Sequence, residues 1–378
     1  MMSASTAAPS GILLLEFDPA IDNAEQGKTL QTGLSVVLQI GNTLWVANDE
    51  TASLERLTLF ANEGSNEYRH ARDHKRFQLN DYLQLPAPST EDPTEFQEVD
   101  IEGLAYENNY LWLVGSHSIK RKKPGSGKTA KQMQKQLAKL SVEANRYLLA
   151  RIPVVERDGL PELSREATSK GKSNTAGRLQ SVGETNELIA ALRDDEHLAP
   201  YLATPGKENG FDIEGLAVSG AKVFLGLRGP VLRGWAVIIE LELKEDKENP
   251  AILRLQQIGP GSRLYKKHFL QLGGLGIRDL CIQGTDLLIL AGPTMDLDGP
   301  VAVFRWKEGT RSKNECVLEQ SQIERLMDLP FGVDADHAEG FCIYSPSPKK
   351  QCLLIVHDAA APSRQWKEHA LMSDIFDL

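Results

Sequence analysis

The stretch Asp100-Ile-Glu-Gly-Leu-Ala105 returns later in the chain as Asp212-Ile-Glu-Gly-Leu-Ala217. Each copy is followed by a short turn and a second apolar run, Leu111–Gly115 and Val223–Gly226. Two short apolar runs joined by a turn are typical of a β-hairpin. The repeated stretch therefore predicts a hairpin that recurs along the chain.

Three further copies match this unit less closely. They are Ala338–Cys342 with Cys352–Val356, Ile277–Cys281 with Leu287–Leu290, and, weakest, Leu34–Leu38 with Leu44–Ala47. Ser35, Gly103, Gly215, Asp279 and Gly340 are taken as equivalent positions, and most intervals between them are about 60 residues. This period suits a four-stranded propeller blade, and further apolar runs follow each hairpin at 54–59, 77–85, 147–155, 235–243, 252–258, 301–306 and 375–378.

We therefore predict an all-β fold, a β-propeller with five blades. The interval between Gly103 and Gly215 is longer than the others, so six blades is the alternative, although no second strand pair is evident between Val155 and Phe211. A β-sandwich pair or an irregular barrel also stays open. The N-terminal run Ile12–Phe17 would complete the last blade by pairing with the C-terminal run Ile375–Leu378, which closes the ring.

The chain is expected to form one domain over residues 1–378, with two insertions. A basic helical insertion spans residues 119–145, and a polar, partly helical one spans 159–200. The basic insertion has eight Lys and Arg and no acidic residue between Lys120 and Lys139, and Met133, Leu137 and Leu140 would form one apolar stripe on its helix. It is either a solvated lid or a cationic arm that helps to hold an anionic substrate.

Composition excludes several classes of protein. The chain has 378 residues, a net charge of −10, 41% hydrophobic and 25% charged residues, which is a globular balance rather than a disordered or fibrous one. The acidic balance predicts no nucleic-acid partner. No apolar run approaches the ~20 residues needed to cross a membrane, and there is no signal peptide, so we expect no membrane partner and a cytoplasmic location. The four cysteines lack CxxC spacing and are predicted to be free thiols, with a Cys342–Cys352 disulfide as the alternative.

A propeller would gather acids on one rim, because the start of each inner strand and the end of each second strand lie on the same face. We expect ligand binding by Asp100, Glu102, Asp212, Arg228, Arg278, Glu339 and His357, metal binding by Asp100, Asp212 and Asp336, and catalysis by His117, His337 and Glu214. Clustered carboxylates are costly to bury, so arginines, a divalent cation such as Ca²⁺ or Mg²⁺, or a ligand must offset them. Alternatively, Glu102, Glu214 and Glu339 cap the backbone of neighbouring blades, and the histidines are structural.

The chain resembles the bacterial family called domain of unknown function 3616. The matching stretches are the two Asp-Ile-Glu-Gly-Leu-Ala copies, Gly-Ser-His-Ser (115–118), Gly-Leu-Arg-Gly-Pro (226–230), Gly-Leu-Gly-Ile-Arg-Asp-Leu (274–280) and His-Ala-Glu-Gly-Phe (337–341). The resemblance implies a propeller-like fold. More distantly, the Asp-x-Glu-Gly-Leu-Ala motif is similar to the esterase-like phytase propellers, which implies phosphate-ester hydrolysis.

Two functions follow from these expectations. The first is a binding protein whose acidic, histidine-containing rim takes a small anionic ligand or a protein partner. The alternative is a metal-assisted hydrolase of a phosphate ester or related anionic ester, with His117 or His337 as general acid or base. Whether the protein is an enzyme stays open.

Overall fold

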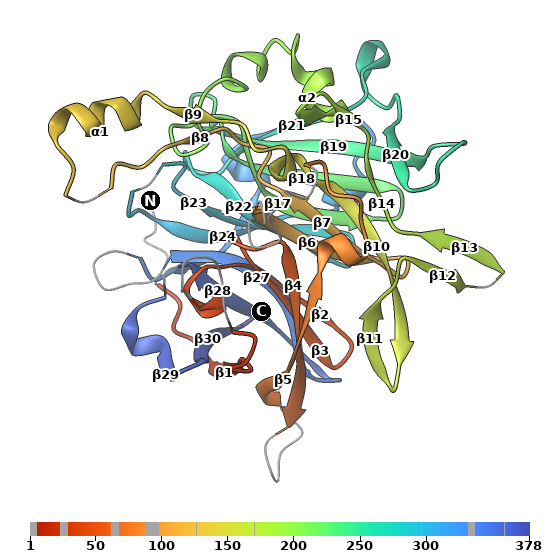
Figure 1. The fold of residues 1–378 in the computed structure, drawn as a ribbon, viewed down its shortest axis with the longest axis vertical. Coiled ribbons are helices and arrows are strands. Elements are labelled where there is room, and N and C mark those ends of the chain that lie inside the picture. The colour runs from red at the N-terminus through yellow and green to blue at the C-terminus, as the bar shows by residue number, and fades with distance from the viewer. Residues whose placement is uncertain are drawn as a thin grey trace.

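The computed structural model describes residues 6–22, 29–61, 68–87, 98–125, 127–169, 171–295, 297–331, 337–358 and 360–378. Asp336, one of the predicted metal ligands, lies outside the described residues. Within them the protein consists mostly of β-strands (Figure 1). No helix in the described part of the chain is long and apolar enough to cross a membrane.

The strands form five antiparallel units of four. Unit 1 is β2 (Leu34–Ile40), β3 (Thr43–Asn48), β4 (Ser53–Ala61) and β5 (Tyr68–Gln78); unit 2 is β6 (Ile101–Glu107), β7 (Tyr110–Gly115), β10 (Leu149–Arg157) and β11 (Leu160–Leu163). Unit 3 is β17 (Asp212–Ser219), β18 (Lys222–Gly229), β19 (Trp235–Glu245) and β21 (Lys266–Gln271); unit 4 is β22 (Gly276–Gln283), β23 (Asp286–Gly292), β24 (Val301–Trp306) and β26 (Glu324–Leu329). Unit 5 is β27 (His337–Ser347), β28 (Lys350–Asp358), β30 (Ala370–Asp377) and β1 (Gly11–Glu16).

The inner strands of the five units pack against one another in circular order. β2 lies beside β6, β6 beside β17, β17 beside β22, β22 beside β27, and β27 beside β2. The approach is close: a Cβ on Gly103 would stand 2.6 Å from the Leu216 Cβ, and one on Gly340 would stand 2.7 Å from the Ser35 carbonyl oxygen. Glycine at these positions is therefore required by the spacing of neighbouring strands.

A hydrophobic layer fills the space between each pair of neighbouring units. Within the described chain the core divides into five clusters, and each cluster combines residues from two adjacent units. The middle of strand β18 is apolar because both of its faces are covered: Val223 and Leu225 pack towards unit 2, while Phe224 packs towards unit 4. Because successive side chains of a strand point to opposite faces, a sheet covered on both faces needs continuous apolar runs.

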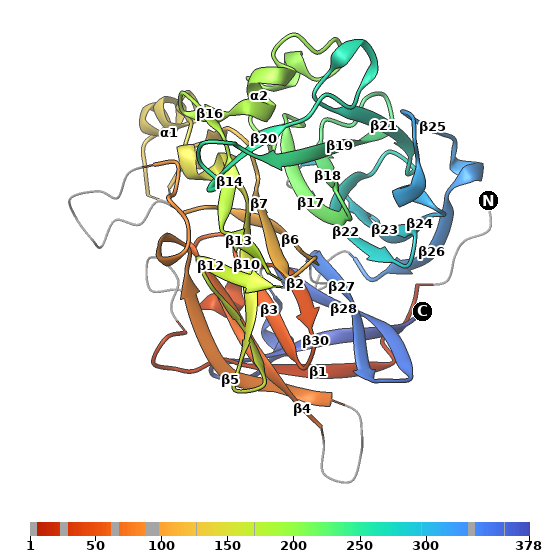
Figure 2. The same ribbon diagram turned by 90° about the vertical axis from the view of Figure 1, so that its right-hand side faces the viewer.

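The two chain ends meet in unit 5, as predicted. β1 pairs antiparallel with β30, from Gly11 opposite Ile375 to Glu16 opposite Ala370 (Figure 2). β1 also pairs in parallel with β5 and so joins unit 5 to unit 1. Two further parallel contacts join outer edges, between β14 (Gly177–Leu179) and β20 (Ile252–Leu255) and between β21 and β25 (Val317–Leu318).

The structure corrects two details of the sequence analysis. The segment between Val155 and Phe211 was expected to lack a second strand pair, yet it contains β11, β14 and four more short strands, β12 (Glu166–Ser169), β13 (Lys172–Thr175), β15 (Ser181–Val182) and β16 (Thr185–Asn186), before helix α2 (Glu187–Leu192). These strands are too short and polar to show a period in the sequence. In the weakest repeat, Val36 rather than Ser35 occupies the position of Gly103.

The remaining elements include the short strands and the helix of the basic segment, and the cysteines are free as predicted. The basic insertion contains β8 (Lys120–Arg121), α1 (Ala130–Leu137) and β9 (Leu140–Ser141); β29 (Gln365–Lys367) flanks β30. All four cysteines are free, and Cys352 stands opposite Tyr344 rather than Cys342.

Candidate functional site

A β-bulge occurs at the same place in all five inner strands. In unit 2, Ile101 pairs with Gly115 and Gly103 with Val114, so Glu102 is the extra residue. The extra residues of the five strands are Ser35, Glu102, Glu214, Arg278 and Glu339, which we call the bulge residues. A bulge redirects a side chain and is common beside functional sites. The sequence repeat thus places five equivalent side chains at one end of the inner strands.

Two arginines pair with the acids of units 3 to 5. Arg278 Nη1 is 2.7 Å from Glu339 Oε1 and 3.3 Å from Glu214 Oε2. Arg228, from the end of β18, places Nη1 2.5 Å from Glu214 Oε1 and contacts Asp212 through Nη2. Both guanidinium groups are almost fully buried, and their pairing with carboxylates offsets much of the cost of that burial.

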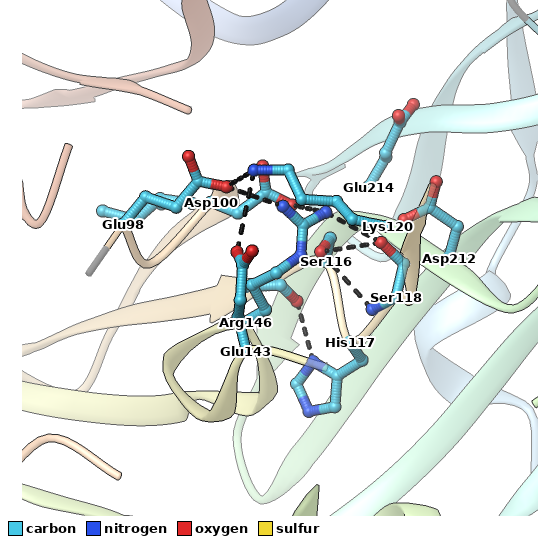
Figure 3. Close-up of polar contacts among 12 residues, drawn as sticks. Glu98, Asp100, Ser116, His117, Ser118, Lys120, Glu143, Arg146, Asp212 and Glu214 are labelled. Atoms are coloured by element: carbon cyan, nitrogen blue, oxygen red, sulfur yellow. Dashed lines mark hydrogen bonds and ion pairs between the residues drawn. The ribbon is translucent and has the colours of Figure 1, made fainter. Parts of the chain in front are cut away.

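A third arginine holds the neighbouring acids of unit 2 (Figure 3). Arg146 lies in a short 3₁₀ helix (Ala144–Tyr147) and contacts Asp100 through Nη2. Its Nη1 is 2.9 Å from Glu98, and its Nη2 donates to Ser118 Oγ at 2.8 Å. Nothing in the repeat pointed to Arg146, because the 3₁₀ helix belongs to the connection between two strands of unit 2.

Glu102 and Asp49 differ from these paired acids. Among the described residues, neither side chain has an ion pair or hydrogen bond to its carboxyl group. Burial, with the neighbouring carboxylates of Asp100 and Glu214, raises the pKa of Glu102 well above its usual value. Burial, followed by the charges of Asp100, Asp358 and Glu339, raises the pKa of Asp49 from 3.8 to about 8. Asp49, at the end of β3, therefore carries a proton at neutral pH.

Other side chains tie neighbouring units together through the backbone. Asp279 accepts hydrogen bonds from the Leu280 N–H at 2.7 Å and, across to unit 5, from the Phe341 N–H at 2.9 Å. Ser35 Oγ donates to the Ile101 carbonyl oxygen of unit 2 at 2.6 Å. These two residues have the capping role that the sequence analysis considered for the glutamates of the repeat.

The three candidate histidines have different partners, although His337 and His357 lie on the paired strands β27 and β28. His117 is buried, its Nδ1 donates to the Gly115 carbonyl oxygen at 2.7 Å, and Nε2 accepts from Asn186 Nδ2 at 2.7 Å. Burial lowers the pKa of His117 to about 4, so the ring is neutral and both nitrogens are engaged. His337 is exposed, 3.3 Å from Asp298, and His357 lies 3.8 Å from Asp374.

Of the predicted metal ligands, Asp100 and Asp212 are described, and their carboxylates lie close enough to repel each other. Asp100 and Asp212 each contact an arginine. No group of three or more His, Cys, Asp or Glu side chains that could hold a metal ion is found in the described segments. Among the described residues at this end of the protein, arginines pair with Asp100, Asp212, Glu214 and Glu339, whereas Glu102 and Asp49 form no ion pair.

Comparisons with known proteins give one family and distant structural similarities. A family model described as protein of unknown function (DUF3616) matches residues 33–374. The search among curated proteins gives no match. The PQQ-bound form of aldose sugar dehydrogenase from Streptomyces coelicolor is similar at 11% identity and a TM-score of 0.35, covering 97% of this chain and 100% of that one. A "putative 6-phosphogluconolactonase" from Bacteroides uniformis is similar at 12% identity and a TM-score of 0.35, covering 87% and 90%.

Proposed function

We propose a binding function for this chain, which belongs to the DUF3616 family of proteins of unknown function: the end of the inner strands that carries the bulge residues binds a small ligand with a positive charge. The observation that carries this proposal is that Glu102 and Asp49 form no ion pair among the described residues, while Asp100, Glu214 and Glu339 each pair with an arginine. A positive group between Glu102 and Asp49 would relieve the repulsion of the surrounding carboxylates.

The balance of charge favours a cation over the small anionic ligand expected from sequence. Arg146, Arg228 and Arg278 are each already paired with at least one carboxylate. An anion would have to displace one of these pairs and leave a buried carboxylate without a partner, which is costly. A cation needs no such exchange.

Asp49 gives this binding a pH dependence with a definite sign. Its pKa is raised from 3.8 to about 8, so without ligand the carboxyl holds a proton at neutral pH. A cation that contacts Asp49 must displace this proton. Affinity is therefore expected to increase between about pH 6 and about pH 8 and to level off above, because the carboxylate is then already ionised.

Isothermal titration tests the proposal with Ca²⁺, Mg²⁺ and the organic cation spermidine as separate probes. We expect one site for at least one probe and a loss of about tenfold or more in affinity for Glu102→Gln. Glu248→Gln, an exposed acid between β19 and β20, is the matched control and should bind as the wild type does. Absence of binding for all three probes, or equal affinity of both variants, would contradict the proposal.

Metal-assisted hydrolysis of an anionic ester is the second candidate. It is favoured by the protonated Asp49 carboxyl, since a carboxylic acid with a raised pKa beside ionised carboxylates can act as a general acid. Asp49 would donate its proton to the leaving-group oxygen while water attacks the ester. A screen of phosphomonoesters and lactones with Ca²⁺ or Mg²⁺ tests it, and turnover that persists in Asp49→Asn would exclude this role.

The finer details of the fold are part of the same proposal. We infer that each four-stranded unit is one blade, so that the protein is a closed five-bladed β-propeller. The circular packing of β2, β6, β17, β22 and β27 and the five hydrophobic layers support this. A relationship to the esterase-like phytase propellers and a cytoplasmic location stay predictions.

A further inference from the structure

The basic insertion forms an arm, which we define as residues 120–141. Its two ends pair as β8 and β9, with Lys120 opposite Ser141 and Arg121 opposite Leu140. Between them, α1 begins with a capping box in which Thr129 and Gln132 satisfy each other's backbone N–H groups. In Figure 1 the arm projects from the body, with α1 beyond the sheets. The arm is thus an ordered element with its own local hydrogen bonds.

The arm leaves apolar side chains uncovered. Helix α1 has no buried residue, and Met133 and Leu137, which share one helix face, are 36% and 46% exposed. Leu140, in β9, is 47% exposed, and Val142, just beyond it, is 42% exposed. The body of the same chain does not bury this stripe.

The arm and the body carry opposite charge. The arm has eight Lys and Arg and no acid, whereas the remaining 34 Lys and Arg face 52 Asp and Glu, a formal charge of −18. Six arm lysines have no ion pair within the described residues: Lys122, Lys123, Lys128, Lys131, Lys135 and Lys139. The other two cations of the arm, Lys120 and Arg121, pair with carboxylates of the body. Lys120 contacts Glu98, and Arg121 Nη2 donates to Glu208 Oε2 at 3.1 Å, both carboxylates of the body.

We propose that the arm docks on the acidic body of a second copy of this chain. The arm's own body already pairs its first two cations but leaves the outer lysines and the apolar stripe unpartnered. A second copy has the same acidic surface. The outer lysines can reach it there, because only the arm's own body is held at a fixed position relative to the arm by β8 and β9. Reciprocal exchange of two arms gives a closed two-fold dimer, the commonest symmetry of homo-oligomers. Because the contact combines ion pairs with apolar burial, high salt should weaken it without removing it completely.

Multi-angle light scattering and sedimentation velocity over a concentration series test this with the full chain. We expect a concentration-dependent dimer that weakens at high salt. The double variant Lys131→Glu/Lys135→Glu should raise the dissociation constant of the dimer by about tenfold or more. The variant Met133→Ser/Leu137→Ser should also raise it. Circular dichroism and thermal unfolding would confirm that the variants remain folded, which is expected because α1 packs on no core.

The control variant makes the same change in net charge elsewhere. The variant Lys244→Glu/Lys247→Glu changes one exposed lysine near the end of β19 and one in the connection to β20, and it should leave the dimer intact. A wild type that is monomeric at all concentrations overturns the proposal, as does an arm variant that dimerises like the wild type. Arm-dependent binding of monomeric protein to anionic vesicles or to RNA would equally overturn it in favour of those partners.

Discussion

Glu102 and Glu214 occupy the same position in two copies of one hexapeptide, yet their surroundings differ. Glu214 contacts both Arg228 and Arg278, whereas Glu102 forms no ion pair among the described residues and only feels the charges of Arg146 and Arg228 at longer range. The difference arises because Arg228 ends the second strand of unit 3 and Arg278 is the bulge residue of unit 4. Unit 2 has Gly115 and Ser116 where unit 3 has Leu227 and Arg228. Identical local sequences thus meet different electrostatic environments.

This contrast predicts that replacing glutamate by glutamine lowers the stability of the protein at Glu214 but not at Glu102. Glu214→Gln should lower the free energy of unfolding by about 3 kcal/mol, because it leaves two buried guanidinium groups short of a counter-charge. Glu102→Gln should leave stability unchanged or raise it, because the neutral amide removes a carboxylate whose ionised form is disfavoured by burial and by neighbouring acids. Urea unfolding of both variants at neutral pH measures the difference. Equal losses for the two would show that Glu102 has a stabilising partner.

At the scale of the element, the inner strands of units 2, 3 and 5 combine a bulge with a glycine directly after it. The bulge turns the residue before the glycine towards the end of the strands, and the glycine lets the neighbouring strand approach. In unit 5, the Cβ position of Gly340 lies 2.7 Å from both the Ser35 carbonyl oxygen and the Val36 Cα. These are backbone atoms of unit 1, which cannot move without shifting β2.

Gly340→Ala is therefore expected to lower the free energy of unfolding by about 1–3 kcal/mol through overpacking. Gly125→Ala is the matched control, because the nearest atom to its Cβ position is the flexible Lys128 Cε at 3.3 Å. Chemical unfolding of both variants provides the measurement. A loss confined to Gly125→Ala, or absent from both, would mean that β27 and β2 can separate at no cost.

At the scale of the whole molecule, strand β1 connects the beginning of the chain to its end. It completes unit 5 through β30 and contacts unit 1 through β5. Leu13 and Leu15 are fully buried in the layer between these two units, while Ile12, directly before Leu13 on the opposite face of the strand, is 44% exposed. The N-terminal strand thus contributes to two units and to the core that joins them.

Leu13→Ala should therefore lower the free energy of unfolding by about 2–5 kcal/mol, the usual cost of a cavity in a packed core. Ile12→Ala, one residue away on the exposed face, should cost less than about 1 kcal/mol. Calorimetry should also show the whole molecule unfolding in one transition for Leu13→Ala, because the units share their hydrophobic layers. A separate early transition would indicate that unit 5 unfolds independently of the others.

The hairpins of the units and their order were predictable from sequence because their signals are local, whereas the outermost strands β21 and β26 were not predicted, and the run 252–258 contains β20 instead. Apolar runs, turns and the repeated hexapeptide identified the hairpins of all five units, and the third strands at 235–243 and 301–306 agree with β19 and β24. The short strands between Val155 and Phe211 were not predicted, since they owe their pairing to neighbours such as β10 and β20 rather than to their own composition.

In units 2, 3 and 5 the sequence by itself determined which side chains are equivalent, because the bulge glutamate and the glycine after it belong to one short hairpin. Only the tertiary structure decided which of them are neutralised. Arg146 reaches Asp100 from a connecting 3₁₀ helix, and Arg278 reaches Glu214 and Glu339 from the neighbouring inner strand. Electrostatic pairing depends on distances of a few ångströms between residues far apart in the chain, and hairpin periodicity carries no information about those distances.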